Sequence, residues 1–207
     1  MGIRRYTLAA ALLFAVIGVG LYSQEKKEEK PAGAMSAAGV TTYKIDPVHS
    51  SVLFRVKHMN LAYFYGRFTA IDGMILWDDK NPANSSITAQ IATDSIDTHF
   101  EKRNQDLKGP DFFNVLEFPS IQFKSRKIEK AGDAKYKVDG DLTLHGVSRP
   151  LTIELEKTGE GPGPGGGYRV GGQTVFAIKR SDFGMTYLLN GVSDEVVLTI
   201  SVEAVRQ

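Results

Sequence analysis

The residues best suited to chemistry in this chain are its four histidines, His49, His58, His99 and His145. None of them stands in an HExxH motif or in another pairing typical of zinc ligands, and a zinc site needs several ligands that converge. The chain contains no cysteine, which excludes disulfide bonds, thiolate metal sites and a cysteine nucleophile. The sequence therefore predicts neither a metal site nor a bound cofactor.

Other segments carry residue types that are used in catalysis or phosphate binding. Ser148 and Ser193 lie in Gly-Val-Ser-Arg and Gly-Val-Ser-Asp, so the Gly-x-Ser-x-Gly elbow of serine hydrolases is absent. The glycine-rich run Gly159–Gly167 leads into a strand pattern and so offers no helix N-terminus to a phosphate group. We expect the Arg-Ser-Asp sequence at 180–182 to form an ion pair that fixes its loop and not a catalytic pair. We expect no catalytic residue in the chain.

His58 is the histidine with the most informative position. It continues an alternation with Val52, Phe54 and Val56, and residues two apart in a strand point to the same face. We therefore expect His58 to point toward the interior. Two interpretations remain open, a core histidine with satisfied hydrogen bonds and a polar contact for the head group of a ligand.

The elements that must position these residues are strands. Eight segments alternate apolar and polar residues with a period of two, which is typical of strands with one buried and one solvated face. In the second segment we expect Phe68, Ala70, Met74 and Leu76 to share a face, with a bulge at Gly73. No long helical period interrupts the series, so we expect antiparallel pairing without crossover helices. The segments are Ser51–His58, Gly66–Trp77, Ser85–Thr93, Ser120–Ile128, Tyr136–Leu144, Pro150–Lys157, Tyr168–Lys179 and Asp194–Val205.

One segment between the third and fourth strands breaks the alternation. Residues 97–114 contain Thr98 and, three positions later, Glu101, the pattern of a capping box, and Gly109 followed by Pro110 ends the expected helix. Eight one-sided antiparallel strands can form a sandwich or a barrel, and an insertion with apolar side chains fits the mouth of a barrel. A helix that only plugs one end of a filled barrel remains an alternative.

The composition restricts the class of protein further. The 207 residues are 42% hydrophobic, which suits one globular domain with a real core. Lys and Arg total 25 against 24 Asp and Glu, whereas proteins that bind nucleic acid carry a basic surplus. We therefore expect no nucleic-acid partner.

The N-terminal residues have the pattern of an export signal. Arg4 and Arg5 precede an apolar run over residues 6–22, after which the chain turns polar. We expect residues 1–23 to be a signal peptide or, since the run approaches the length of a membrane span, an anchor that keeps the protein near the membrane. Residues 24–40 are expected to be a flexible linker and residues 41–207 the folded domain.

A series of motifs follows in order along the folded domain. They are Ile45-Asp46-Pro47-Val48-His49-Ser50, Lys57-His58-Met59, Gly66-x-Phe68, Ser95-Ile96-Asp97-Thr98, Asp111-Phe112-Phe113, Phe118-Pro119-Ser120, Gly140-Asp141-Leu142-Thr143-Leu144-His145-Gly146, Arg180-Ser181-Asp182-Phe183-Gly184-Met185 and Asp194-Glu195-Val196. From about Tyr43 to Glu203 the chain closely resembles the YceI family of exported lipid-binding proteins. The resemblance implies a periplasmic, lipocalin-like antiparallel barrel, often a homodimer, whose tunnel holds a polyisoprenoid or a similar long-chain lipid.

One stretch departs from the family pattern. The helix of the family usually reads Arg-Asp-x-His-Leu, where this chain has Arg103-Asn104-Gln105-Asp106-Leu107. An aspartate is thus replaced by Asn104 and a histidine by Asp106, which alters polar groups near the expected mouth of the barrel. The departure concerns contacts with a ligand head group and leaves the barrel unaffected.

We therefore predict a non-enzymatic protein that binds and carries a long-chain apolar ligand. Burial of an alkyl chain contributes about 0.8 kcal/mol for each methylene group, so such a ligand needs no precise polar contact. The alternatives are an enzyme acting on a lipid-like or small apolar substrate, with His58 beside Arg103 or Asp106 as acid and base, and a solid barrel that binds a partner protein. The residues predicted to bind the ligand are Val52, Phe54, Val56, His58, Phe68, Phe100, Arg103, Leu107, Phe112, Phe113, Phe123, Leu142, Phe176 and Phe183.

Overall fold

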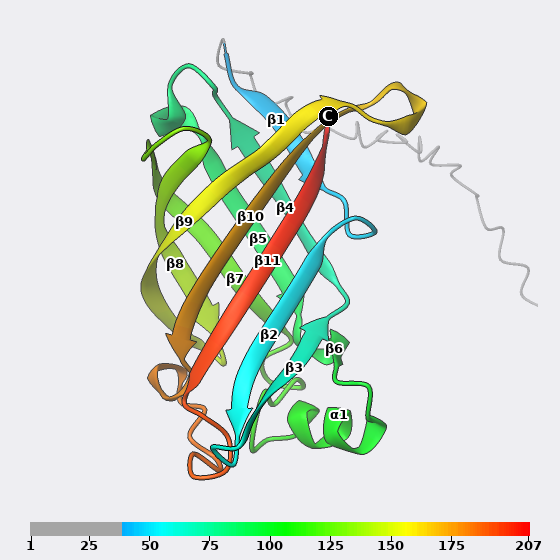
Figure 1. The fold of residues 1–207 in the computed structure, drawn as a ribbon, viewed down its shortest axis with the longest axis vertical. Helices are drawn as coiled ribbons and strands as arrows, with labels where there is room; N and C mark the ends of the chain where they lie inside the picture. The colour runs from blue at the N-terminus through cyan, green and yellow to red at the C-terminus, as the bar shows by residue number, and fades with distance from the viewer. Residues whose placement is uncertain (1–38) are drawn as a thin grey trace, which may run out of the picture. The chain divides into compact units, whose positions relative to one another are not determined.

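The strands fold into one antiparallel barrel (Figure 1). The structure, a computed structural model, describes residues 39–207, so the predicted signal peptide and most of the predicted linker lie outside the described residues. Within the described part of the chain, no helix has the length and apolar character needed to cross a membrane. The strands are β1 (Thr41–Ile45), β2 (Ser51–His58), β3 (Ala62–Phe68), β4 (Ile71–Trp77), β5 (Ser86–Ala92), β6 (Ile96–Asp97), β7 (Ser120–Lys130), β8 (Lys135–Leu144), β9 (Val147–Pro162), β10 (Tyr168–Lys179) and β11 (Glu195–Arg206). The helices are α1 (Glu101–Lys108) and the short 3-10 helices η1 (Pro82–Asn84), η2 (Thr93–Ser95), η3 (Pro164–Gly166) and η4 (Arg180–Phe183).

Eight strands close the barrel. In the order β1, β4, β5, β7, β8, β9, β10 and β11, each pairs antiparallel with the next, and β11 pairs back with β1, where Tyr43 lies opposite Arg206. The remaining strands extend this ring, because β2 continues β1 along β11, β3 pairs with β2 and leads into β4, and β6 pairs with β3. The expected eight-stranded, lipocalin-like antiparallel barrel with a short helical insertion is confirmed.

The second expected strand, Gly66–Trp77, is two strands in the structure. β3 ends at Phe68 and β4 begins at Ile71, and both of these residues are buried although they are three positions apart. The break between them shifts the alternation by one residue. The expected inward positions of Ala70, Met74 and Leu76 are therefore wrong: Ala70 is exposed between the two strands, and the odd-numbered residues of β4 point inward instead.

Gly73 marks a close approach of strands and not the expected bulge. It lies opposite Ala89 in an uninterrupted register between β4 and β5. A Cβ atom at position 73 would come within 2.2 Å of the carbonyl oxygen of Thr88 and within 2.9 Å of the Ile45 side chain. Glycine is therefore required here by the space available, and the ladder continues through it.

The segment between β6 and β7 lies at the lower end of the barrel as drawn in Figure 1. Helix α1 begins without a side-chain cap, so the expected capping box of Thr98 and Glu101 is wrong. The hydroxyl of Thr98 instead donates to Asn104 Oδ1 at 2.6 Å and accepts a hydrogen bond from Arg103 Nε at 2.9 Å. The helix ends at the predicted Gly-Pro stop.

Candidate ligand-binding cavity

The interior of the barrel contains two adjoining cavities. An upper cavity of about 140 Å³ lies among the inward residues of the barrel strands, and a lower cavity of about 790 Å³ lies between β2, β3, α1 and the loop before β11. Free volume of this size favours a ligand-binding barrel over a filled one. The cavities adjoin, since both are lined by Phe68, Ile121, Leu144, Ile178 and Leu198.

The upper cavity offers almost only aliphatic and aromatic surface. Most of its lining comes from alternate residues of the barrel strands, as a period of two predicts. Lys157 is the one charged residue among the described residues that line it, and its ammonium pairs with Asp79 at 2.7 Å and with Glu160 at 3.0 Å. Burial alone would lower the pKa of Lys157, but the hydrogen bonds to these carboxylates outweigh burial and raise that pKa. The chemistry of this cavity suits the apolar part of a ligand.

Aromatic side chains hold residues 98–119, which we call the α1 segment, against the barrel around the lower cavity. Phe113 meets Phe68 edge-on with ring centroids 5.5 Å apart, and Phe112 meets Tyr187 at 5.3 Å. Phe68 also packs against Phe54 of β2 at 5.8 Å. Aromatic pairs of this geometry each contribute about 0.5–1.5 kcal/mol beyond the area that they bury. The turn after α1 is therefore part of the cavity wall.

Charged side chains gather where the lower cavity opens. Lys102, Arg103, Asp106 and Asp111 line it from α1 and the following turn, and His58 lines it from the end of β2. These groups include donors and acceptors of hydrogen bonds and both signs of charge. The mouth can therefore bind a polar or charged head group, while the cavity above it accepts an apolar chain.

Hydrogen bonds and an aromatic contact hold Arg103 in place at the mouth. In addition to its bond to the Thr98 hydroxyl, its Nη2 donates to the Thr98 carbonyl at 2.7 Å, and its guanidinium lies 4.2 Å from the centroid of the Phe64 ring. Asn104 beside it is buried, and its Oδ1 accepts hydrogen bonds from both the N–H and the hydroxyl of Thr98. Asn104 thus stabilises the turn before α1, whereas Asp106 lines the cavity. Of the two departures from the family pattern, the one at Asp106 therefore changes the lining of the mouth.

Arg180 holds the loop that forms one side of the mouth. Its side chain is buried, and its guanidinium donates hydrogen bonds of 2.8–3.0 Å to four main-chain carbonyls of residues 185–193. Burial lowers the pKa of Arg180. The predicted loop-fixing role is confirmed, but the acid that helps is Asp194, whose carboxylate accepts from the N–H and hydroxyl of Ser181. Among the described ion pairs, none joins Arg180 to Asp182.

The structure brings most of the predicted ligand-binding residues to the two cavities. Val52, Phe100 and Phe183 are the exceptions: Val52 packs in the core, the Phe100 ring is 54% exposed beside Arg103, and Phe183 is buried near a groove beside β9 and β10. The lower cavity is lined by Phe54, Val56, His58, Phe68, Arg103, Leu107, Phe112 and Phe113. The upper cavity is lined by Phe68, Phe123, Leu142 and Phe176.

Several lining residues were missed by reasoning from the sequence. Leu144, Ile178 and Leu198 lie on predicted inward faces, so the alternation alone could have included them. Phe64 precedes the expected start of its strand, because β3 begins at Ala62. Tyr187 belongs to a loop without a period, and no local signal marks it as a lining residue.

His58 lies at the exposed mouth, so its interpretation as a core histidine is wrong. It lines the same cavity as Arg103 and Asp106, the partners considered for an acid–base pair. Within residues 39–207, no hydrogen bond or ion pair joins His58 to either of them. A contact between His58 and a ligand head group stays a prediction.

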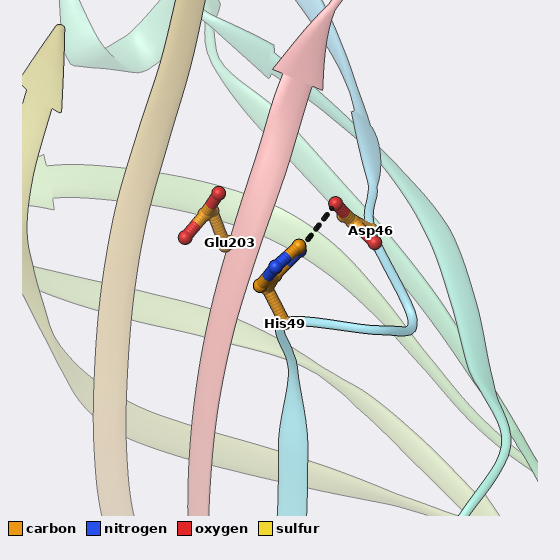
Figure 2. A group of neighbouring side chains, drawn as sticks. All are labelled: Asp46, His49 and Glu203. Carbon is orange, nitrogen blue, oxygen red and sulfur yellow. Dashed lines mark hydrogen bonds and ion pairs between the residues drawn. The ribbon is translucent and has the colours of Figure 1, made fainter. Parts of the chain in front are cut away.

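A second group of titratable side chains lies at the turn between β1 and β2. Figure 2 shows Asp46 and His49 directed at one another beside Glu203, with 2.8 Å between Asp46 Oδ2 and His49 Nδ1. These three residues could hold a metal ion, but Arg169 Nη1 already lies 2.7 Å from Asp46 Oδ2 and 2.5 Å from Glu203 Oε1. The hydrogen bond from Arg169, helped by His49, holds the pKa of Asp46 well below its usual range. The group ties the turn to β10 and β11.

Comparisons with known proteins agree with this fold. A family model described as a YceI-like domain matches residues 43–204. A UPF0312 protein from Yersinia pestis (strain Pestoides F) is 43% identical over 177 residues, which cover 84% of this chain and 90% of that protein.

Two solved structures are similar to this barrel. Burkholderia cenocepacia BcnA superposes with a TM-score of 0.71 and 25% identity, covering 77% of this chain and 98% of its own. A polyisoprenoid binding domain from Saccharophagus degradans has a TM-score of 0.63 and 17% identity, covering 81% of this chain and 99% of its own, which is a likeness of fold. Since the family model spans nearly the whole barrel, the chain belongs to the YceI-like family.

Proposed function

We propose that this protein binds one long-chain apolar molecule, such as a polyisoprenoid, inside its barrel and carries it without chemical change. The observation that carries the proposal is the pair of adjoining cavities, an apolar upper one and a wider lower one with charged side chains at its mouth. An apolar chain fits the upper part, and its polar end stays near Arg103 and Asp106.

The energetics suit a ligand of this kind. Ten buried methylene groups contribute about 8 kcal/mol before the cost of ordering the chain is subtracted. The lining of the upper cavity holds Gln122, Thr174 and the paired Lys157 as its polar side chains, so a chain that enters it displaces few hydrogen-bonded groups. The affinity for the ligand then depends on the apolar area that is buried and not on a specific polar contact.

A structural neighbour supports the class of ligand. The Saccharophagus degradans domain that shares this fold is described as polyisoprenoid binding. We extend this ligand class to the present chain because its own cavities have the matching apolar lining. All of these lining residues come from one chain, so the proposal holds for a monomer and for the expected homodimer alike.

The proposal includes a periplasmic location. It is supported by the basic, apolar and polar order of residues 1–23, which is the order of a secretory signal. The linker over 24–40 would allow an uncleaved segment to keep the barrel near the membrane.

Ligand content of the purified protein tests the proposal. Native mass spectrometry and lipid extraction are applied to the wild type and to Val56→Arg, which places a charge in the lower cavity. Leu53→Arg is the matched control, because Leu53 lies on the same strand and points outward. We expect a long-chain lipid in the wild type and in Leu53→Arg, and its loss from Val56→Arg.

Circular dichroism of each variant shows whether it has folded. Equal lipid content in a folded Val56→Arg variant would show that the cavity is not the binding site. A wild-type protein that neither contains a lipid nor takes up a fluorescent fatty acid or prenyl chain would contradict the carrier function itself.

A further inference from the structure

Two turns with exposed apolar side chains flank the mouth of the lower cavity, and we call them the mouth turns, residues 59–61 and 187–189. Single exposed apolar residues are common on soluble domains, but a group of them beside an open cavity marks an interaction site. Leu61 has 85% of its surface exposed. The exposed apolar side chains of the mouth turns are Met59, Leu61, Tyr187, Leu188 and Leu189.

Hydrogen bonds hold the mouth turns side by side at the bottom of Figure 1. The N–H of Met59 donates to the carbonyl of Gly191 at 2.7 Å, and the N–H of Gly191 donates to the carbonyl of Leu188 at 3.0 Å, so Gly191 links the two turns. Arg180 anchors the second turn from inside through the carbonyl of Tyr187 at 2.8 Å. The apolar side chains are therefore presented on a fixed scaffold.

The backbone of the mouth turns includes left-handed residues. Met59, Asn60 and Leu188 have φ angles of 51°, 56° and 54°. This left-handed region is uncommon for residues other than glycine and is an outlier for bulky ones. At Met59 and Asn60 it is the geometry of a tight hairpin turn, which the hydrogen bond from the Leu61 N–H to the His58 carbonyl closes at 2.9 Å. These conformations keep two large apolar side chains at the rim of the cavity.

A stripe of basic and aromatic side chains leads away from the mouth turns on the outer face of β2 and β3, and we call Arg55, Lys57, Tyr63 and Tyr65 the outer stripe. Lys57 lies opposite Tyr63 and Arg55 opposite Tyr65, and the Arg55 guanidinium is 4.2 Å from the centroid of the Tyr63 ring. Among the ion pairs of residues 39–207, none involves Arg55 or Lys57. Both residues are half-buried, so the exposed parts of their side chains can meet an anionic partner.

The outer stripe lies at the distance from the mouth turns that separates lipid head groups from the acyl chains below them. Lys57 and Tyr63 lie two positions along the chain from Met59 and Leu61, and two extended residues span about 7 Å, so the outer stripe begins within about 7 Å of the mouth turns. Amphipathic elements that bind membranes bury their apolar face by about 5–10 Å. Tyrosine and basic residues are favoured at the level of lipid head groups.

We infer that the mouth turns dock into the surface of an anionic phospholipid bilayer, with their apolar side chains among the acyl chains and the outer stripe among the phosphates. The cavity then opens onto the bilayer, because Tyr187 and Leu188 line it and are also exposed. The inference rests on the proposed function for its purpose, since a long-chain ligand then passes between membrane and barrel without crossing water. Docking itself requires no bound ligand.

A single fluorescent label tests the docking, because the chain has no cysteine of its own. The full chain with Leu61→Cys, or with Val48→Cys as control, carries a bimane label and is mixed with vesicles of phosphatidylcholine and phosphatidylglycerol that contain a nitroxide-labelled lipid. Val48 is 81% exposed in the turn at the opposite end of β2. We expect a blue shift and quenching for the label at 61 and neither for the label at 48. The N-terminal segment is the same in both proteins, so the comparison reports on the mouth turns.

A double variant, Leu61→Asp with Leu189→Asp, gives a second measurement on the full chain. Each buried apolar side chain that is lost weakens membrane binding by about tenfold, so we expect the bound fraction to fall toward the level that the N-terminal segment alone sustains. Neither residue lines the upper or the lower cavity, so ligand content should stay at the wild-type level. Val48→Asp should change neither quantity.

The outcomes separate docking from ligand binding. An unshifted label at 61 with normal ligand content overturns docking and leaves the proposed function intact. A shifted and quenched label at 61 in a protein that holds no lipid supports docking and contradicts the carrier function. A shift that appears without vesicles and grows with protein concentration would show that the mouth turns contact a second copy of the chain, and it overturns docking.

Discussion

Arg169 shows how one side chain can decide the role of a whole cluster. Asp46, His49 and Glu203 have the atoms and the spacing of a cation site, but the guanidinium of Arg169 lies against both carboxylates. Arg180 acts in the same way on main-chain carbonyls at the mouth. A guanidinium has five donors in a planar fork and can satisfy several oxygens at once. At both places the arginine makes a structural clamp.

The clamp on Asp46 predicts a dependence of stability on pH. The hydrogen bond from Arg169 is the largest cause that lowers the pKa of Asp46, followed by that from His49. A carboxyl group with a lowered pKa in the folded state stabilises that state above its unfolded pKa of about 3.9, and this contribution is lost as the pH falls below that value. The free energy of unfolding of Asp46→Asn should therefore be below that of the wild type at pH 7, and the difference should shrink below about pH 4.

Urea unfolding at a series of pH values measures this difference. Asp72→Asn is a suitable control, because Asp72 is exposed and its one ion pair among the described residues, with Lys44, is long at 3.9 Å. A difference between wild type and Asp46→Asn that is constant from pH 7 to pH 3 would contradict the assigned role of the carboxylate.

The α1 segment is the element that forms the wall of the lower cavity next to the mouth turns. Its turn presents Phe112 and Phe113 to the cavity, where they contact Tyr187 and Phe68. The helix itself has eight residues and buries only Asn104, so little apolar area holds it in place. Elements with few buried apolar contacts open locally at low free-energy cost. We therefore expect the segment to be a mobile rim that is stabilised by the ligand.

Hydrogen exchange tests this role of α1. Amides from 98 to 107 should gain protection when a lipid is bound, while those of β11 from 196 to 202 should stay unchanged. Phe112→Ala combined with Phe113→Ala should speed release of the lipid by about tenfold or more, because two large apolar contacts are removed. Phe100→Ala is the control, since the Phe100 ring lies outside both cavities. Equal protection of α1 with and without lipid would show that the segment is a fixed plug.

At the scale of the whole molecule, closure of the barrel joins the two ends of the described chain. β1 pairs with the last residues of β11, and the N–H of Gln207 donates to the carbonyl of Thr42 at 2.9 Å. All hydrogen-bonded ladders of the barrel are thus complete with residues from Thr41 onward. The closed ring of eight strands leaves no unpaired edge among them, whereas β3, outside the ring, pairs with β6 only at Arg67 and Phe68.

Residues 1–38 should therefore be dispensable for folding and ligand binding. A fragment of residues 39–207 produced in the cytosol is expected to be soluble, with the strand content of the full chain by circular dichroism. It should take up a fluorescent long-chain lipid in vitro with the affinity of the full chain and should lack its export. An insoluble fragment would show that the N-terminal segment is needed by the barrel.

Much of the barrel was determined by the sequence alone. Alternation is a local property of a strand, so inward residues such as Val138, Leu142 and Ile153 could be assigned before their partners were known. The antiparallel barrel, the helical insertion and the family followed from the same local patterns and motifs, whereas β1, which completes the ring, was not among the expected strands. Most predicted cavity residues came from these inward faces, including Phe54, Val56 and Phe123.

Only the tertiary structure decided the positions that depend on distant pairing. The break between β3 and β4 shifts the inward face by one residue, because neighbouring strands set the register and no local signal marks the break. The mouth combines His58, Arg103 and Leu188, which come from separate parts of the chain and meet because the barrel closes. The sequence predicted an ion pair for Arg180, whereas its guanidinium binds main-chain carbonyls. Main-chain carbonyls carry no sequence signature, so the sequence could not indicate these contacts. Contacts of this kind are specified by the closed barrel as a whole.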